Sequence, residues 1–261
     1  MNNIALRVSY NGAPFCGFAK QPKTLTVQGE LEQALSLLYK RTVEIVCAGR
    51  TDTGVHALSQ VVNFFLNDDE VNLRSLETLR RSLNGIIHES IAVTGILFAP
   101  ETFSARFDAT SREYRYYISD SRFRPVLLDT RAWHVRHPVN DVKMNEAAQL
   151  LVGEHDFKSF CMAVSATGKP TRRTLLEVGV SREMHFGEEL VVVRVLGSSF
   201  LHSMVRTIVG SLVEIGLGKQ EASWLEEIVD AKDRQAAGQN APAQGLVFWN
   251  VNYPDNLNIK W

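Results

Sequence analysis

The sequence lacks any apolar run that approaches ~18 residues, the length that a membrane-spanning helix needs. Its opening residues lead directly into alternating apolar and polar positions, without the basic segment and apolar core of an export signal. Its three cysteines, Cys16, Cys47 and Cys161, lie far apart and have no Cys-x-x-Cys spacing, so neither a disulfide framework nor a zinc site is indicated. We therefore expect a protein of the reducing cytoplasm.

An excess of positive charge is also missing. The net charge is −1 at pH 7, which does not by itself indicate a nucleic-acid partner. The chain has 261 residues and is 45% hydrophobic, so it can bury a substantial core in one large domain or in two smaller ones.

What the sequence does contain is a regular alternation of strand and helix patterns. Helical spacing of apolar residues predicts helices over 27–40, 73–86, 142–151, from Ser198 or Ser199 to 215, and 224–231. Alternation and short apolar runs predict strands over 4–10, 42–46, 61–66, 91–98, 113–118, 131–135, 174–180, 190–196 and 246–253. This order favours an α+β fold with helices on one face of a largely antiparallel sheet. The two halves have similar numbers of elements, so we expect two domains with a cleft.

One polar loop lies between two of the predicted strands, in residues 47–57. Gly49 and Gly54 bracket Arg50 and Asp52 there, and glycine is used where the chain must turn tightly or approach a ligand closely. A surface turn is the ordinary interpretation of such residues, and a short motif alone favours it. The alternative is a loop that presents a carboxylate and a guanidinium for chemistry.

Arginines and aromatic residues alternate in a second segment, residues 106–136. It contains Arg106, Phe107, Arg112, Tyr114, Arg115, Tyr116, Tyr117, Arg122, Phe123, Arg124, Arg131, Trp133 and Arg136. Such segments suit phosphate contacts and base stacking. Equally, the arginines of an amphipathic strand pair can be solvated or paired with nearby Asp and Glu side chains. Both interpretations stay open at this point.

Arg206 stands out within the long apolar helix that begins near Ser198. An unpaired buried cation is expensive, so this position favours a carboxylate partner. The alternative is a side chain at the helix edge whose charged end reaches solvent.

Several motifs together resemble the TruA family of tRNA pseudouridine synthases. They are Tyr10-Asn11-Gly12 with Phe15-Cys16-Gly17-Phe18, the loop Gly49–Ala57, Phe103–Phe107 with Arg112–Tyr116, and Phe200–Arg206 with Ile208-Val209-Gly210. They occur in the family's order, from Tyr10 to Tyr253. The resemblance implies the pseudouridine synthase fold, with two similar α/β halves, mainly antiparallel sheets and a central RNA-binding cleft. We expect residues 1–105 to form the domain with the Asp52 loop and residues 106–261 to form the domain with the other site residues.

The resemblance also implies an activity and roles for individual residues. The enzyme would isomerise uridine to pseudouridine at positions 38, 39 and 40 of the tRNA anticodon stem-loop, as a homodimer, without cofactor or metal. Asp52 would be the catalytic nucleophile, and Arg50 would take the space vacated by the extruded nucleotide. Tyr114 would stack on the target base, Arg206 would pair with Asp52, and Leu246 would contact the base.

Three places depart from the family pattern. Asn11 stands where Asp is usual, Phe18-Ala19 where Trp-Gln is common, and Thr53 where Ala is usual. None removes a catalytic group. The first two leave the RNA contacts of their loop open.

Two other functions fit parts of the sequence. Asp52-Thr53-Gly54 matches the Asp-Thr-Gly of aspartic proteases, but these need two such loops and the chain has no second one. A non-catalytic RNA-binding module on the same scaffold is the other alternative, and the presence of Asp52, Tyr114 and Arg206 argues against it.

Overall fold

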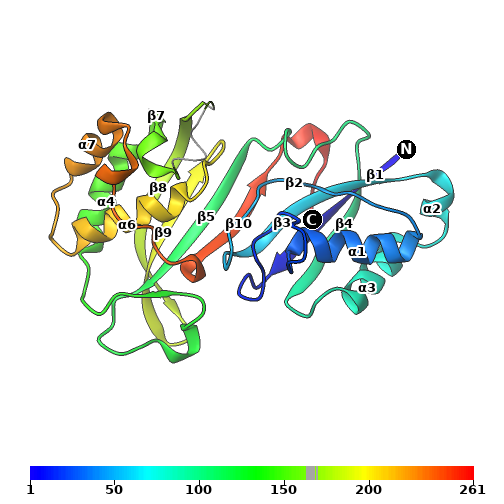
Figure 1. Cartoon of the computed structure of the whole chain (residues 1–261), viewed down its shortest axis with the longest axis horizontal. Coiled ribbons are helices and arrows are strands. Elements are labelled where there is room, and N and C mark those ends of the chain that lie inside the picture. The colour runs from blue at the N-terminus through cyan, green and yellow to red at the C-terminus, as the bar shows by residue number, and fades with distance from the viewer. Residues whose placement is uncertain (163–167, 169) are drawn as a thin grey trace. The chain divides into compact units, whose positions relative to one another are not determined.

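The computed structural model, which describes residues 1–162, 168 and 170–261, is a mixed α+β protein with two compact units (Figure 1). The first unit comprises Met1–Arg112 and Phe248–Trp261, and the second comprises Glu113–Val247. The predicted α+β class with mainly antiparallel strands is confirmed. The chain enters the second unit within strand β5 (Ser111–Ser119) and returns within strand β10 (Leu246–Asn252).

This division differs from the expected boundary after residue 105, because residues 106–112 and the last part of the chain belong to the first unit. Two contacts account for the difference. The Tyr253 hydroxyl donates to the Ala105 carbonyl at 2.8 Å, and the Arg112 guanidinium donates to the Ala48 carbonyl.

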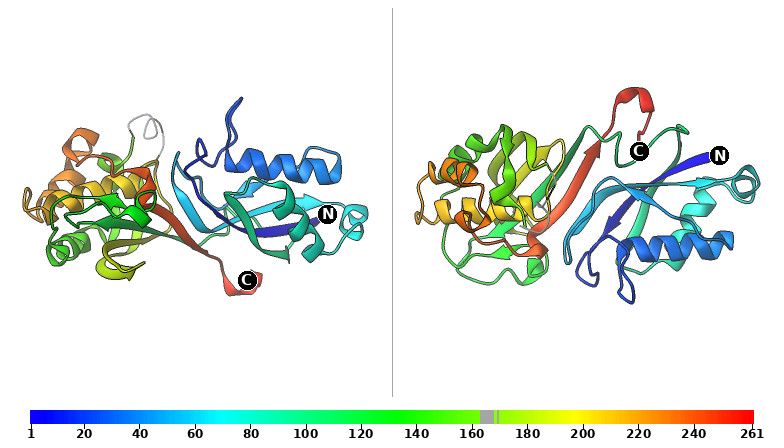
Figure 2. Two further views of the ribbon diagram at one scale, coloured as in Figure 1. Left: turned by 90° about the horizontal axis from the view of Figure 1, so that it is seen from below. Right: turned by 45° about the horizontal axis from the view of Figure 1, so that its top comes forward.

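The first unit is built on strands β1 (Asn2–Tyr10), β3 (His56–Leu66) and β4 (Ile91–Ala99), with β1 antiparallel to both of the others. The short strand β2 (Val46–Cys47) pairs with β3. Helix α1 (Val27–Tyr39) follows the predicted apolar stripe, and the Thr26 side chain caps it by accepting from the Gly29 amide. Helix α3 (Leu76–Ile86) packs against β4 and contacts α1, and Figure 2 shows the two helices next to each other in both views.

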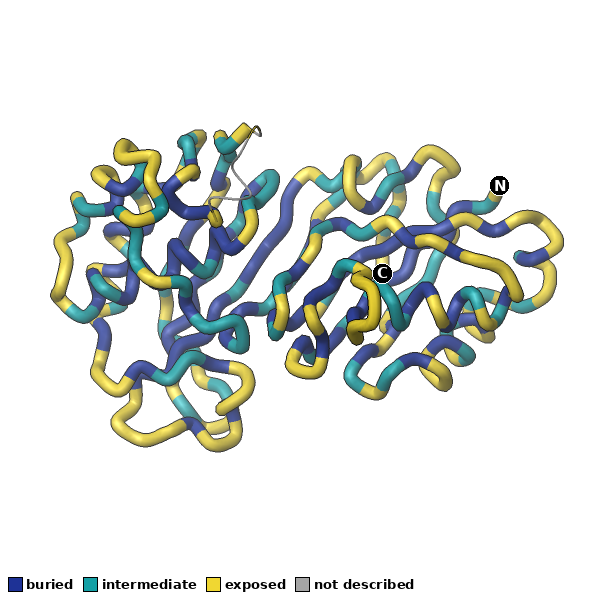
Figure 3. Tube along the Cα trace, viewed as in Figure 1, coloured by how far each residue is buried: buried dark blue, intermediate teal, exposed yellow. Residues whose placement is uncertain are grey.

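The second unit contains a strand order β5-β9-β8-β7, with the short β6 (Trp133–His134) parallel to β5. Strands β8 (Arg172–His185) and β9 (Glu188–Gly197) form a long antiparallel hairpin, and β7 (Gly153–Asp156) pairs with β8. Helices α4 (Asp141–Ala148), α6 (Met204–Gly216) and α7 (Trp224–Ala231) complete this unit, and α4 contacts both β8 and α6. In each unit, buried residues follow the strands and the inner helix faces (Figure 3).

Short 3-10 helices occur at Val126–Leu128, Gln149–Leu151, Phe157–Phe160, Arg234–Ala236, Ala243–Gly245 and Asp255–Leu257. Among the described residues, no helix is long and apolar enough to cross a membrane.

Two helix predictions were wrong at their boundaries. The predicted helix over 73–86 begins only after residue 75, because the Ser75 side chain caps α3 and a separate helix α2 (Asp68–Asn72) precedes it. The helix expected from Ser198 or Ser199 begins at Met204, because Ser203 adopts a left-handed conformation with φ of 61°. Arg206 therefore lies in the first turn of α6 and not in the middle of a helix.

Candidate active site

The Asp52 loop of the first unit connects β2 to β3. Arg50 is exposed and Asp52 is half-buried. The loop closes with a turn in which the Val55 amide donates to the Asp52 carbonyl at 3.1 Å. The loop therefore presents a guanidinium and a carboxylate two residues apart.

Buried side chains without charge hold this loop by hydrogen bonds. The hydroxyls of Tyr10 and Thr51 are hydrogen-bonded at 2.8 Å, and the Gln60 amide donates to the Gly49 carbonyl at 2.6 Å. Tyr10 is fully desolvated, and this burial raises the pKa of its hydroxyl. The residues next to Arg50 and Asp52 are thus fixed by groups that carry no charge at neutral pH.

Close backbone packing against the segment that follows β1 also fixes this loop. The Phe18 amide donates to the Thr51 carbonyl at 3.0 Å, and the Gly12 amide donates to His56 Nδ1 at 3.1 Å. A Cβ atom on Gly12 would lie 2.0 Å from the Val55 carbonyl oxygen, so only glycine fits there. The loop that follows β1 and the Asp52 loop therefore pack backbone to backbone.

A buried arginine anchors the chain just before the Asp52 loop. The Arg112 guanidinium donates to the carbonyls of Ala48 (3.1 and 3.2 Å), Arg106 (2.6 Å) and Ala109 (3.1 Å). Burial raises the pKa of the Cys47 thiol to about 11, although the charges of Arg50 and Arg106 act to lower it. The start of the loop thus lies in the positive field of two arginines.

In the second unit, Arg206 is half-buried in the first turn of α6. Its Nε donates to the Ala241 carbonyl at 2.7 Å, and the Ala241 amide donates back to the Arg206 carbonyl at 3.0 Å. The segment 239–241 lies close to α6, because the Thr207 hydroxyl donates to Asn240 Oδ1 at 2.6 Å. This packing fixes the orientation of the Arg206 guanidinium.

Tyr116 lies close to segments that carry predicted site residues of this unit. Its hydroxyl donates to the Pro242 carbonyl at 2.7 Å, and a Cβ on Gly245, just before Leu246, would lie 2.6 Å from its ring. Burial raises the pKa of Tyr116, while the charge of Arg206 acts to lower it. Tyr114 is two residues away on β5 and therefore on the same face. Its ring lies 4.9 Å from that of Phe200, at 79°.

The structure thus gathers the predicted site residues into two groups. Arg50 and Asp52 share one loop of the first unit. In the second unit, the charge of Arg206 acts on Tyr116, Leu246 follows the glycine that packs on the Tyr116 ring, and Tyr114 lies on the same face of β5. The sequence analysis assigned no role to Tyr10, Gln60 or Tyr116. Tyr10 and Tyr116 belong to the motifs of the resemblance, and Gln60 lies three residues after the Asp52 loop. Each occupies an ordinary core position of a strand, which does not by itself indicate a role in the site.

Some arginines of the arginine-rich segment 106–136 are bound within the fold, and others are exposed. Arg112 and Arg115 are internal, because Arg112 binds backbone carbonyls and Arg115 Nε donates to Glu113 at 2.9 Å. Arg194 also pairs with Glu113 at 3.0 Å. Although burial acts to raise the pKa of Glu113, hydrogen bonds from Arg194 and Arg115 hold it below its usual range. The remaining arginines of the segment are exposed: Arg106 before β5, Arg122, Arg124 and Arg131 between β5 and β6, and Arg136 after β6.

Among the described residues, no group of three or more His, Cys, Asp and Glu side chains is placed to hold a metal ion. The Asp52 loop contains one carboxylate and the cation Arg50, and the charges of Arg50 and Arg106 both act on Cys47 at its start. The chemistry that this loop suits best is that of a single carboxylate acting on an anionic substrate.

The chain is similar to known proteins over nearly its whole length. A family model described as tRNA pseudouridine synthase matches residues 7–108 and 147–254. The chain is 40%, 41% and 38% identical in sequence to proteins named tRNA pseudouridine synthase A from Shewanella denitrificans, Shewanella woodyi and Vibrio atlanticus, respectively. Each alignment covers 98% of this chain, and 95%, 95% and 94% of the respective relatives.

These matches define an RNA-modifying enzyme of the isomerase class. The chain belongs to the tRNA pseudouridine synthase family.

Proposed function

We propose that this protein isomerises uridine to pseudouridine at positions 38, 39 and 40 of the tRNA anticodon stem-loop, with Asp52 as the catalytic nucleophile. One observation carries the proposal. The Asp loop of the resemblance keeps Arg50 and Asp52 and departs from the family pattern only at Thr53, and hydrogen bonds fix it through Thr51 and Gly49. The fixed loop supports a role that requires a carboxylate in one position.

The reaction exchanges one bond to the ribose for another. The N1–C1′ bond of uridine breaks, the base turns, a C5–C1′ bond forms, C5 loses its proton and N1 gains one. No oxidant or reductant is needed, because the product is an isomer of the substrate. A carboxylate can attack ribose C1′ or base C6, or can abstract the C2′ proton.

Arg206 is proposed to pair with Asp52. A guanidinium next to a carboxylate keeps it ionised and orients it. The contact from Arg206 Nε to the Ala241 carbonyl supports this role, because it holds the planar group in one orientation.

The remaining roles concern the flipped nucleotide. Extruding a base costs a few kcal/mol, which stacking and a side chain that fills the gap can offset. Tyr114 is proposed to stack on the base, Leu246 to contact it and Arg50 to fill the gap. The edge-on contact of Tyr114 with Phe200 would hold the tyrosine ring during stacking.

The partner and the location belong to the same proposal. The protein would act in the cytoplasm as a homodimer in which one tRNA touches both subunits, without metal or cofactor. The exposed arginines of the loop after β5 would meet phosphates, so we expect tRNA affinity to fall steeply with salt.

The central test replaces Asp52. Tritium release from tRNA labelled at uridine C5 should fall by at least about 10³-fold in Asp52→Asn and Asp52→Ala, because the reacting group is removed. Asp69→Asn is the matched control, since Asp69 is an exposed carboxylate of the same unit and should leave the rate unchanged. Release that persists in either Asp52 variant would remove Asp52 from the mechanism.

A second test concerns Arg206. Arg206→Ala should lower the turnover number much more than it weakens tRNA binding, because the guanidinium acts on Asp52 and not on the phosphates. Arg172→Ala removes an exposed arginine of the same unit and serves as the control. Equal losses in turnover and binding would make Arg206 a docking residue. If the native protein bound tRNA without releasing tritium, the non-catalytic alternative would hold.

A further inference from the structure

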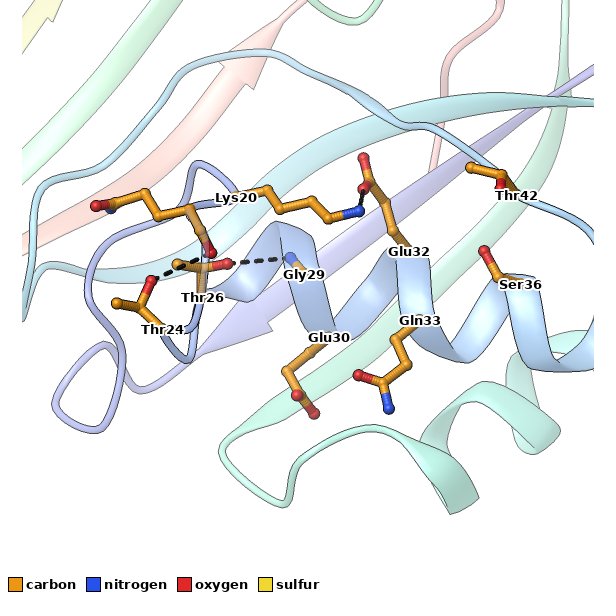
Figure 4. A pocket seen from close by; sticks show the side chains of 10 residues that line it. Lys20, Thr24, Thr26, Gly29, Glu30, Glu32, Gln33, Ser36 and Thr42 are labelled. Atoms are coloured by element: carbon orange, nitrogen blue, oxygen red, sulfur yellow. Dashed lines mark hydrogen bonds and ion pairs between the residues drawn. The ribbon is translucent and has the colours of Figure 1, made fainter.

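One acidic side chain of helix α1 is buried, in contrast to the usual exposure of glutamate on a helix. Glu32 is only 4% exposed. It lies at the edge of a polar cavity of about 320 Å³, which Lys20 and Glu30 also line (Figure 4).

Both carboxylate oxygens of Glu32 have partners from other segments. Its Oε2 accepts from Lys20 Nζ at 2.9 Å, an ion pair that is visible in Figure 4. Its Oε1 accepts from the Gln28 side chain at 2.8 Å and from the Ile45 amide at 3.3 Å. Gln28 in turn accepts from the Lys20 amide at 3.1 Å. Glu32 therefore joins α1 to two separate stretches of the chain.

Both of these stretches lead directly to the Asp52 loop. Lys20 ends the segment in which the Phe18 amide binds the Thr51 carbonyl. Ile45 immediately precedes β2, after which the loop begins. Glu32 is thus linked to the start of the loop through Ile45, and to Thr51 through the chain from Lys20 back to Phe18.

We propose that Glu32 is a positioning residue for catalysis, which holds the segments on either side of the Asp52 loop in register. The proposal rests on the proposed role of Asp52. A displacement of a reacting group by about 1 Å can cost about 10²-fold in rate, whereas RNA affinity comes from many separate phosphate contacts. Loss of the Glu32 contacts should therefore lower turnover and leave tRNA binding almost unchanged.

The test compares Glu32→Gln with Glu30→Gln. Both variants remove one negative charge from the same helix and from the same cavity, but only Glu32 is paired with Lys20. For Glu32→Gln we expect kcat to fall by about tenfold with KM for tRNA within about twofold. Glu30→Gln should match the wild type in both constants. A purely structural role would lower the melting temperature without changing kcat of the folded enzyme.

Lys20→Met gives a second route to the same result. The Lys20 side chain is 59% exposed, so its replacement should not prevent folding. We expect a smaller fall in kcat, and the double variant Lys20→Met with Glu32→Gln should be no worse than Glu32→Gln alone, because both act through one ion pair. Additive effects confined to KM would overturn the proposal and make both residues RNA-docking groups.

The failure of this inference can be told apart from the failure of the proposed function. If Asp52→Asn is inactive but Glu32→Gln has the wild-type kcat, only the positioning role is wrong. If Asp52→Asn is active, the proposed function itself is wrong, and the positioning role falls with it.

Discussion

The contacts around the Asp52 loop of the first unit and the contacts between the strands of the second unit are of different physical kinds. In the first unit, the Asp52 loop is fixed by a hydroxyl pair, an amide and backbone packing around Gly12. In the second unit, arginine–carboxylate networks brace the strands of the sheet, with Glu113 between Arg115 and Arg194, and Asp120 bound by Arg182. The first unit also contains the buried carboxylates of Glu32, which pairs with Lys20, and Glu70, which pairs with Arg41.

The two kinds of contact should lose stability under different conditions. Backbone packing tolerates no added atom but does not depend on pH. Ion pairs accommodate small shifts in side-chain position, but they lose strength when the carboxylate takes up a proton. The contacts around the Asp52 loop should therefore be sensitive to steric change, and the ion pairs of Glu113 and Asp120 in the second unit should be sensitive to acid.

The largest expected effect is that of Gly12→Ala. The new methyl group would lie 2.0 Å from the Val55 carbonyl oxygen, which is backbone and cannot move without the whole loop. We expect the free energy of unfolding to fall by about 3 kcal/mol, and tritium release to fall with it. Denaturant unfolding and the release assay measure the two effects.

Gly85→Ala is the control for this substitution. Nothing lies within 4 Å of the corresponding Cβ position in α3, so the variant should be as stable as the wild type or more stable by up to about 1 kcal/mol. A Gly12→Ala variant with wild-type stability would show that the two loops are not rigidly packed.

The next effect is that of Asp120→Asn in the second unit. Asp120 is bound by two nitrogens of Arg182, at 2.8 and 3.1 Å, and its Oδ2 also accepts from the Val139 amide at 3.0 Å. Removing the charge leaves Arg182 with Asp141 and Glu189, so we expect a loss of about 2 kcal/mol at pH 7.

The control for Asp120→Asn is Glu154→Gln. It breaks the ion pair of Glu154 with Arg172, in which both side chains are exposed, and should leave stability unchanged. Equal losses of stability in the two variants would mean that burial does not strengthen the ion pair of Asp120 with Arg182.

Local patterns in the sequence predicted much of this fold. Helix α1 could be predicted from its apolar spacing and its Thr26 cap, and β1 from its alternation. The start of α6 could not, because the left-handed conformation of Ser203 leaves no trace in apolar spacing. Nor could the return of the chain to the first unit within β10, since it depends on contacts across the length of the chain, such as Tyr253 with Ala105.

Some residues of the candidate site could likewise be predicted from the sequence, and others could not. Arg50 and Asp52 stand out as polar residues between two strands. Tyr10 and Tyr116 look like core residues, because their hydrogen bonds reach residues far along the chain, at Thr51 and Pro242. Glu32 has the helical spacing of a polar face, and only the fold shows that its carboxylate is buried.

The smallest expected effect is a difference in how the stability loss of two variants, one in each unit, depends on pH. Hydrogen bonds from Arg194 and Arg115, opposed by burial, hold the pKa of Glu113 below its usual range. A carboxyl group with a lowered folded-state pKa stabilises the fold above the unfolded-state pKa of about 4.3, and this contribution disappears as pH falls through the folded-state value. Glu113→Gln lacks the contribution, so its stability should decline less below that pH than the stability of the wild type.

Tyr10→Phe in the first unit is the matched comparison. It removes the hydrogen bond to Thr51, and because burial raises the pKa of Tyr10 above its ordinary value, the hydroxyl is neutral throughout the acid range. We expect each variant to lose about 1 kcal/mol at pH 7. In denaturant unfolding from pH 7 down to pH 3.5, the loss in Tyr10→Phe should stay constant, whereas the loss in Glu113→Gln should shrink. A constant loss in both would mean that charge does not distinguish the two units, since the Glu113 network would then act by packing alone.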